Sequence, residues 1–323
     1  MSAVESIKKA LQKIPFVNRA VIRYKETEKH VSYGSENADK TFFVIRRNAP
    51  NAGLYSFVLT NLGWIRYAVS RGYIPVIDMQ SFYNTYLMHE QVGVTNSWEY
   101  YFEQPGGYSL CDIARSKNVI LSSINAPEEA PLTGIEKDLV SIEMWRDLAA
   151  RYLSFSQPVK TEIERQCRIL FAGKRVLGVL CRGTDYIGTR PAQHPIQPTA
   201  DMVIEKADQL KEALCCDLIY LATEDDSILR AFKEYFRGEL RFYEEKRYED
   251  TGSQNINELS DYMNDQSSDP RAAHYQKGFD YAVTIGILAE CNGLVAGRVS
   301  GSYGALLQGK HYEETYLFDL GLY

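Results

Sequence analysis

The feature that most constrains the fold is a regular alternation of apolar strand patterns and amphipathic helix patterns after Lys174. Strands are expected at residues 176–181, 217–223, 240–243, 293–296 and 315–319, with helices at 199–214, 226–236, 274–291 and 301–308. Such alternation predicts a parallel, doubly wound sheet. Because ligands of these sheets sit at the carboxyl ends of the strands, the residues that follow Cys181, Leu221 and Ala296 form the expected site.

The first half of the chain follows a similar but less regular pattern. Strands are expected at residues 41–46, 74–78 and 118–122, and helices at 54–71, 135–153 and 158–171. The 323 residues exceed the usual size of one domain. We therefore expect two α/β domains, at residues 1–155 and 156–323. The polar segment 244–270 interrupts the alternation, and a mobile loop is expected there.

Composition and targeting signals exclude several classes of protein. The formal charge of −6 argues against nucleic-acid binding, which needs clustered Lys and Arg. No apolar run approaches the roughly 20 residues of a membrane span. The first 16 residues read as an amphipathic helix opened by a capping box, without the features of a signal peptide, so we expect a cytoplasmic protein. The six cysteines lack C-x-x-C spacing and are expected to be reduced thiols.

The segment 177–186, LGVLCRGTDY, is the most informative motif. An apolar strand ends directly in Arg182, Gly183 and Thr184, at the expected ligand edge of the sheet. A guanidinium there can grip two phosphate oxygens, a glycine lets the backbone approach closely, and a threonine offers a hydroxyl. The alternative, which stays open, is that Arg182 pairs with a neighbouring carboxylate.

The next strand, in segment 219–226 (IYLATEDD), ends in a similar polar group of Thr223, Glu224 and Asp225. These side chains would face the same edge of the sheet. Alternatively, they cap the following helix, where acidic groups favour the positive end of the helix dipole, and this interpretation suits Asp226 best.

A third strand leads into a glycine- and serine-rich turn that opens a helix, in segment 293–304. Such a turn presents backbone N–H groups to an anion, so Arg298, Ser300 and Ser302 are candidate diphosphate ligands. The alternative is that the glycines serve only close packing. A P-loop-like spacing from Gly304 to Lys310 is rejected, because it lies within the expected helix and lacks the Ser or Thr.

Three blocks of this chain resemble the α1,6-fucosyltransferases, which use GDP-fucose. Those enzymes carry G-V-H-V-R-R-T-D-K-x-G-T-E, then H-P-I, then Y-L-A-T-D-D. The matching segments here are residues 178–190, 194–196 and 220–225. The resemblance covers about the second half of the chain. It implies a GT-B fold of two Rossmann-like domains, with acceptor binding in residues 1–155 and nucleotide-sugar binding in residues 156–323.

The same resemblance implies roles for single residues: Arg182 binds the diphosphate, Thr223 contacts the nucleotide and Ser300 contacts a phosphate. Near the family's guanine-binding aspartate this chain offers Thr284, with Asp280 one helical turn earlier.

Four positions depart from the family pattern. Leu180 replaces a histidine that helps to hold guanine, and Gly183 replaces a second arginine. The family's lysine is Tyr186, and its glutamate, the presumed base of the core enzyme, is Arg190. These departures leave the donor, the acceptor and the catalytic base open.

The resulting hypothesis is an inverting glycosyltransferase that moves a sugar to a glycan or lipid-linked glycan acceptor. GDP-fucose is the first guess for its nucleotide-sugar donor, and we expect no cofactor. The absence of a D-x-D triplet predicts metal independence, with basic side chains stabilising the leaving diphosphate. The whole chain also resembles proteins encoded among bacterial surface-polysaccharide genes, which predicts that pathway and peripheral contact with the inner face of the membrane.

The expected site residues fall into three groups. The catalytic group is Arg182, Asp185 and Arg190. The donor-binding group is Arg182, Gly183, Thr184, His194, Thr223, Asp225, Asp280, Arg298, Ser300 and Ser302. The acceptor-side group is Gly53, Trp98 and Glu103. Candidates for the catalytic base are Asp185, Glu224, Asp225, His194 and Glu103. The alternative for His194 is a structural role, and the alternative for Trp98 is packing in the core.

Two rival functions remain. A non-catalytic protein that binds a nucleotide sugar or a glycan would keep the fold, and the arginine at position 190 favours it. A sugar-nucleotide epimerase is the second rival, although the missing G-x-G-x-x-G fingerprint counts against it.

Overall fold

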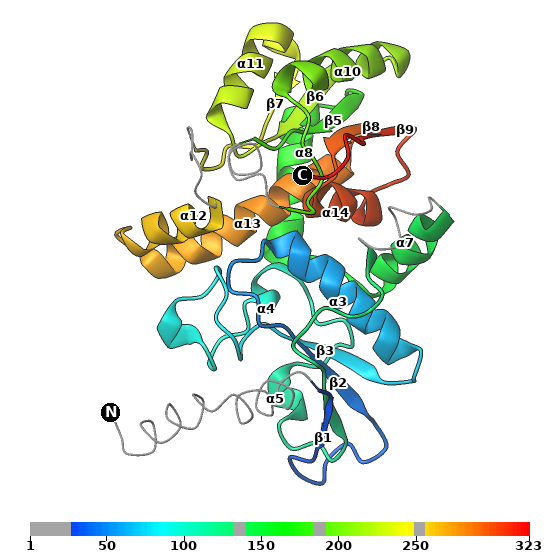
Figure 1. The fold of residues 1–323 in the computed structure, drawn as a ribbon, viewed down its shortest axis with the longest axis vertical. Helices are drawn as coiled ribbons and strands as arrows, with labels where there is room; N and C mark the ends of the chain where they lie inside the picture. The colour runs from blue at the N-terminus through cyan, green and yellow to red at the C-terminus, as the bar shows by residue number, and fades with distance from the viewer. Residues whose placement is uncertain (1–26, 132–139, 184–191, 249–255) are drawn as a thin grey trace.

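The computed structural model describes residues 27–131, 140–183, 192–248 and 256–323. In these ranges the chain forms two β-sheets with helices packed against them, and helix α13 crosses the molecule between the sheets (Figure 1). The expected α/β class is therefore confirmed. The helix expected in the first 16 residues lies outside the described residues.

The first sheet has the strand order β1-β4-β2-β3. Its strands are β1 (Lys29–Val31), β2 (Phe42–Arg46), β3 (Ile74–Asp78) and β4 (Val119–Leu121). β2 pairs in parallel with β3 and β4, while β1 pairs antiparallel with β4. The three strands predicted from apolar runs are confirmed. β1 was not predicted, because it lies in a polar stretch and is short.

The second sheet has the order β7-β6-β5-β8-β9 and is parallel throughout. Its strands are β5 (Val176–Leu180), β6 (Leu218–Ala222), β7 (Leu240–Arg241), β8 (Gly293–Gly297) and β9 (Glu314–Phe318). β5, β6 and β8 are buried along their whole length, as expected for strands covered on both faces. The predicted parallel sheet is thus confirmed.

The helices form where the sequence has amphipathic patterns. They are α3 (Leu54–Val69), α4 (Trp98–Tyr101), α5 (Leu110–Ile113), α7 (Val140–Tyr152), α8 (Gln157–Phe171), α10 (Ala200–Ala213), α11 (Asp226–Phe236), α12 (Ile256–Asp265), α13 (Pro270–Ala289) and α14 (Ser300–Gln308). Two short 3₁₀ helices are η1 (His89–Gln91) and η2 (Arg237–Glu239). Among the described residues, no helix combines the length and apolarity that crossing a membrane requires.

Alternate residues of β5 enter different hydrophobic clusters. Leu177 and Val179 pack with α10 and α11, whereas Val176 and Leu180 pack in a larger cluster that includes residues of α13. This alternation follows from the two-residue period of a strand. Helices therefore cover both faces of the second sheet.

The larger cluster continues from the second sheet into the first half of the chain. At the contact, Gly304 of α14 faces the ring of Tyr55 of α3 so closely that a Cβ atom would collide with it. The Tyr55 hydroxyl donates a hydrogen bond to Gln308 Oε1 at 2.7 Å. From α7, Arg146 donates through Nε and Nη2 to the Leu306 carbonyl at 3.1 and 3.0 Å. The domain division at residue 155 stays a prediction.

The prediction of a loop at residues 244–270 is wrong in part. Helix α12 lies within this segment, and α13 begins at Pro270. Asp269 caps α13 by accepting a hydrogen bond from Ala272 N at 3.0 Å, and a proline suits the first helical position because it needs no N–H donor there. Charge and polarity in this segment therefore mark a helix surface as well as a loop.

Candidate functional site

Arg182 leaves the carboxyl end of β5, at the ligand edge that the sequence predicted. The pairing of Leu180 with Ala222 aligns the ends of β5 and β6, so the residues that follow both strands lie side by side. Arg182 Nε lies 3.5 Å from Glu224 Oε1, and the two side chains are 20% and 27% exposed. The guanidinium is thus held beside a carboxylate at a solvent-accessible edge, as the alternative interpretation expected.

Gly183 and Asp225 are packed against each other behind that edge. A Cβ atom at Gly183 would collide with the Asp225 carboxylate and approach Ile228 Cδ1 to 2.8 Å. Asp225 Oδ1 accepts hydrogen bonds from Ser227 N at 2.8 Å and Ile228 N at 3.2 Å, so Asp225 is the N-cap of α11. The expectation that Asp226 is the cap is wrong, because it is the first helical residue. A glycine at position 183 is explained by this packing.

Thr223 is placed beneath the edge, with 3% of its surface exposed. Its hydroxyl accepts a hydrogen bond from Asp225 N at 3.2 Å. The structure therefore shows a local turn contact for this side chain, and its contact with a nucleotide stays a prediction.

The glycine- and serine-rich turn after β8 brings two of its three candidates to the edge. Arg298 pairs with Asp319 at 3.0 Å, and Ser300 begins α14, whose N-cap Val299 supplies no side-chain hydrogen bond. Ser302 is fully buried and donates to the Gly297 carbonyl at 2.6 Å. The structure thus places Ser302 in the core, which corrects its expected place in the site. An uncapped helix N-terminus favours an anion.

We call the group formed by Arg182, Glu224, Arg298 and Ser300 the sheet edge. Three residues that the sequence analysis assigned to the site, Thr184, Asp185 and Arg190, lie outside the described residues. Their roles stay predictions.

Beyond β6 and β7, the sheet edge continues into an acidic region that sequence reasoning only partly found. Asp280 of α13 accepts hydrogen bonds from Gln276 Nε2 at 2.7 Å and from the Tyr243 hydroxyl at 3.2 Å, and burial raises its pKa. Burial also raises the pKa of Glu245 to about 8, against the opposing effect of Arg247. Glu245 stands in a run of charged residues that reads as a loop, so its burial had no local signal.

Two other predicted residues lie at the surface. His194 is exposed, and its carbonyl accepts a hydrogen bond from Tyr323 N at 3.0 Å. Glu103 is exposed and accepts a hydrogen bond from Lys160 Nζ at 2.9 Å. Glu103 is therefore paired with a lysine of α8, whereas the segment next to His194 reaches the sheet edge, because Gln197 Nε2 donates to the Arg298 carbonyl at 3.3 Å.

The remaining acceptor-side candidates differ in burial. Trp98 is completely buried, stacks on Phe102 with ring centroids 4.5 Å apart and donates through Nε1 to the Glu103 carbonyl at 3.1 Å. It belongs to the core, as the alternative for it expected. Gly53 is partly exposed at the start of α3, and a Cβ atom there would meet nothing within 4 Å.

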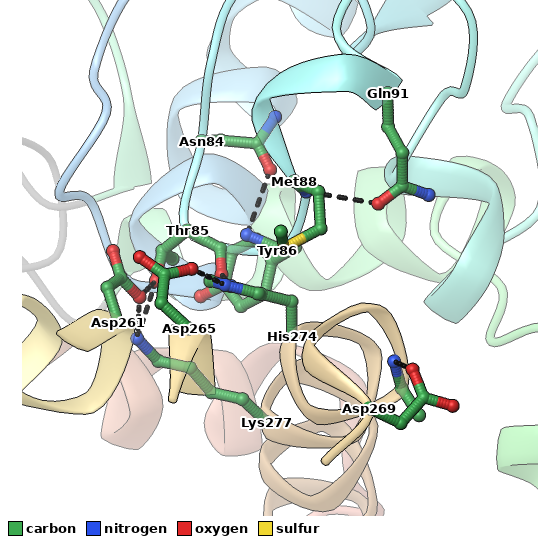
Figure 2. Close-up of polar contacts among 11 residues, drawn as sticks. Asn84, Thr85, Tyr86, Met88, Gln91, Asp261, Asp265, Asp269, His274 and Lys277 are labelled. Carbon is green, nitrogen blue, oxygen red and sulfur yellow. Dashed lines mark hydrogen bonds and ion pairs between the residues drawn. The ribbon is translucent and has the colours of Figure 1, made fainter. Parts of the chain in front are cut away.

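A second polar group, which sequence reasoning missed, joins the loop after β3 to α12 and α13 (Figure 2). We call it the junction cluster, and it comprises Thr85, Asp261, Asp265, His274 and Lys277. Lys277 Nζ donates to Thr85 Oγ1 at 2.5 Å and to Asp261 Oδ1 at 3.0 Å, and Thr85 also donates to Asp261. These contacts connect the first sheet's loops with the helices between the sheets.

His274 completes the junction cluster and is 1% exposed. Its Nδ1 lies 2.8 Å from the Thr85 carbonyl and its Nε2 lies 3.0 Å from Asp265 Oδ1. Burial lowers the pKa of Lys277, against the opposing effect of Asp261. The sequence spacing could have predicted this cluster. Asp261 and Asp265 are four residues apart and His274 and Lys277 are three apart, so each pair shares one face of its helix.

No group of three or more His, Cys, Asp or Glu side chains in the described ranges could hold a metal ion. At the sheet edge, the arginine side chains and the backbone N–H groups at the start of α14 suit an anionic ligand.

Comparison with known proteins shows the fold but not a family. No family model matches the chain, and no curated protein matches its sequence. POFUT1 in complex with GDP is similar in structure, with a TM-score of 0.52 and 9% identity, over 86% of this chain and 99% of that one. The α1,6-fucosyltransferase NodZ co-crystallised with GDP has a TM-score of 0.50 and 14% identity, over 83% and 93% of the two chains.

A structure of fucosyltransferase NodZ from Bradyrhizobium matches with a TM-score of 0.47 and 14% identity, over 83% of this chain and 94% of that one. The likeness to POFUT1 and to NodZ co-crystallised with GDP shows the fucosyltransferase-like GT-B fold that the sequence resemblance implied.

Proposed function

We propose that this protein is a glycosyltransferase that takes its sugar from a nucleoside diphosphate sugar, with GDP-fucose as the first candidate. The observation that carries the proposal is the position of Arg182 at the end of β5, beside the uncapped start of α14. An arginine fork and a helix N-terminus together suit a diphosphate. The fold shared with POFUT1 and NodZ, whose structures contain GDP, supports this reading.

The proposed reaction is an inverting transfer without a metal ion. The oxygen of an acceptor hydroxyl attacks the anomeric carbon, the bond from that carbon to the diphosphate breaks, and Arg182 stabilises the charge on the departing diphosphate. Arg298 adds positive charge at the same edge, and Arg190 is a further candidate from the sequence. Proton removal from the acceptor requires a base on the opposite face of the sugar.

That requirement narrows the candidates for the base. Glu224 lies 3.5 Å from the arginine proposed to hold the leaving group, which puts it on the leaving-group face. Asp225 caps α11, and Glu103 pairs with Lys160. Asp185 and His194 therefore remain the candidates that these contacts do not disfavour. We propose that Glu224 instead orients Arg182 until the diphosphate replaces it.

The proposed biological setting is the synthesis of bacterial surface polysaccharide in the cytoplasm, at the inner face of the membrane. The acceptor would be a glycan or a lipid-linked glycan. These statements rest on the sequence resemblance alone.

Calorimetric titration without added metal tests the donor site. We expect one of GDP, UDP, ADP, CDP and dTDP to bind the wild-type protein, and Arg182→Ala to weaken that binding about tenfold or more, because a charge-assisted contact is lost. Arg175→Ala is the matched control, since Arg175 precedes β5 at the opposite edge and pairs with Glu313. If none of the five diphosphates binds, the proposal fails.

Turnover separates the enzyme from its non-catalytic rival. Release of GDP from GDP-fucose, measured with and without a panel of glycan acceptors, should occur in the wild-type protein and be lost in Arg182→Ala. If GDP-fucose binds tightly but no GDP is released with any acceptor, the non-catalytic binding function is favoured.

A further inference from the structure

A tyrosine of α13 reaches the first turn of α14, next to the sheet edge. The two helices pack side by side (Figure 1). A Cβ atom at Gly301 of α14 would collide with the hydroxyl oxygen of Tyr281. The next nearest atoms are the methyl groups of Ile285 and Leu180, at 3.1 and 3.2 Å. Leu180 ends β5 two residues before Arg182, so the Tyr281 hydroxyl lies at the same end of the sheet as the proposed diphosphate site.

The ring of Tyr281 is held in place by α3. Tyr55 packs edge to face against it, with ring centroids 5.6 Å apart and an angle of 87° between the planes. Tyr55 itself is fully buried and donates its hydrogen bond to Gln308. Because an edge-to-face pair is a favoured aromatic geometry, the phenol of Tyr281 has a defined direction.

The start of α14 is a place where a hydroxyl donor can act on a ligand. The first N–H groups of a helix have no partner within the helix, and the N-cap Val299 supplies no side-chain hydrogen bond. Gly301 is buried, whereas Tyr281 above it is partly exposed. The glycine therefore admits the hydroxyl to the first turn, where an O–H donor adds to the N–H groups that favour an anion.

We propose that Tyr281 is a further catalytic residue, which donates a hydrogen bond to the departing diphosphate. This inference rests on the proposed function, because it assumes a diphosphate at the sheet edge. Negative charge grows on the diphosphate as its bond to the anomeric carbon breaks, so a donor already in position stabilises the transition state more than the bound substrate. The proton stays on the phenol throughout. The sequence analysis assigned no role to Tyr281.

The first test is Tyr281→Phe, which removes the oxygen and keeps the ring. Calorimetry would use whichever of GDP, UDP, ADP, CDP and dTDP binds the full-length wild-type protein most tightly. We expect this diphosphate to bind the variant about tenfold more weakly, the usual worth of one hydrogen bond to a charged group. The nucleoside monophosphate of the same base lacks the terminal phosphate, and its affinity should change less than about twofold.

Turnover gives a second readout. With GDP-fucose as the donor, kcat should fall about tenfold or more in Tyr281→Phe, while KM stays within about threefold, because the contact strengthens in the transition state. Tyr312→Phe is the matched control. Tyr312 is also partly exposed and contacts α13, but its hydroxyl donates to the Leu288 carbonyl at 3.0 Å.

Gly301→Ala tests the position of the hydroxyl independently. The added methyl group would displace the Tyr281 oxygen, so we expect about the same tenfold loss of diphosphate affinity, and alanine is a better helix former than glycine. In a chain that already carries Tyr281→Phe, that methyl group would meet no atom closer than 3.1 Å. Adding Gly301→Ala there should therefore change the affinity less than about twofold.

Three results would overturn the inference: wild-type diphosphate affinity in Tyr281→Phe, equal weakening of diphosphate and monophosphate, or a further large loss when Gly301→Ala is added. If Arg182→Ala abolishes diphosphate binding and Tyr281→Phe binds like the wild type, the donor site stands and only the role of Tyr281 falls. If no nucleoside diphosphate binds the wild-type protein, the proposed function itself fails.

Discussion

The sheet edge and the junction cluster are both built from paired charges, but they differ in burial and in how closely the pairs are held. At the edge, Arg182 and Glu224 are 3.5 Å apart and partly exposed. In the junction cluster, Lys277 lies 3.0 Å from Asp261 and 2.5 Å from the Thr85 hydroxyl, and both charged side chains are less than 20% exposed. A loose pair can exchange its partner for a ligand, whereas a close, buried pair fixes two elements together.

The largest expected effect is on the junction cluster. Lys277→Met should lower the free energy of unfolding by about 3 kcal/mol, because it leaves the Asp261 carboxylate buried without its cation. Thermal unfolding would show this as a drop of several degrees in the melting temperature. Adding Asp261→Asn to the same chain should restore part of the loss, since it removes the stranded charge.

The matched change at the sheet edge is Arg182→Met. Because this pair is longer and partly hydrated, we expect a loss below about 1 kcal/mol, together with the loss of nucleotide binding. Equal destabilisation by the two methionine variants would erase the difference between the regions and show that Arg182 has a structural role.

A smaller effect concerns the pH dependence of stability. The folded protein keeps the Glu245 proton up to its pKa of about 8, whereas the unfolded chain releases it near the ordinary value of 4.5. The unfolded state therefore binds fewer protons between these values, and wild-type stability falls as pH rises through that window.

Glu245→Gln removes this dependence. We expect the glutamine variant to be more stable than the wild type by about 2 kcal/mol at pH 8, after allowing for partial exposure, and little different at pH 5. Melting temperatures of both proteins across this range are the measurement. A constant difference at all pH values would show that the Glu245 carboxyl ionises normally.

The smallest effect separates capping from ligand binding at Asp225. Asp225→Ala should cost about 1 kcal/mol, because α11 loses its N-cap, while Asp225→Asn keeps an oxygen acceptor and should cost less. Nucleotide affinity should change less than about twofold in the asparagine variant. A drop of tenfold or more would restore the donor-binding role that the sequence predicted for Asp225.

The sequence predicted best where local pattern decides structure. The strand at 74–78 was placed correctly at both ends because its apolar residues lie between a glycine turn and polar side chains. Arg182 was placed correctly for the same reason, since a strand end defines the edge of a sheet. The sequence could not decide whether Asp225 or Asp226 caps α11. The N-cap is the residue just before the first helical one, so a shift of one residue in the helix start changes which aspartate takes that role.

The parts that were missed depend on distant contacts. Thr85 and Lys277 are 192 residues apart in the chain, so their hydrogen bond follows only from the packing of α13 against the loop after β3. Glu245 looks like one more charge in a polar run, because its burial comes from α13 and from the path that Arg247 fixes. Trp98 was ambiguous because aromatic residues serve cores and sugar sites alike.

The close contact between Gly304 and Tyr55 has a consequence for how the molecule moves. Helices from the two ends of the chain touch there without room for an added methyl group, within a hydrophobic core that serves both sheets. A hinge that swung the sheets apart would expose that core to water. The protein should therefore melt in one cooperative calorimetric transition, and a donor would have to be captured by local rearrangement of loops and side chains.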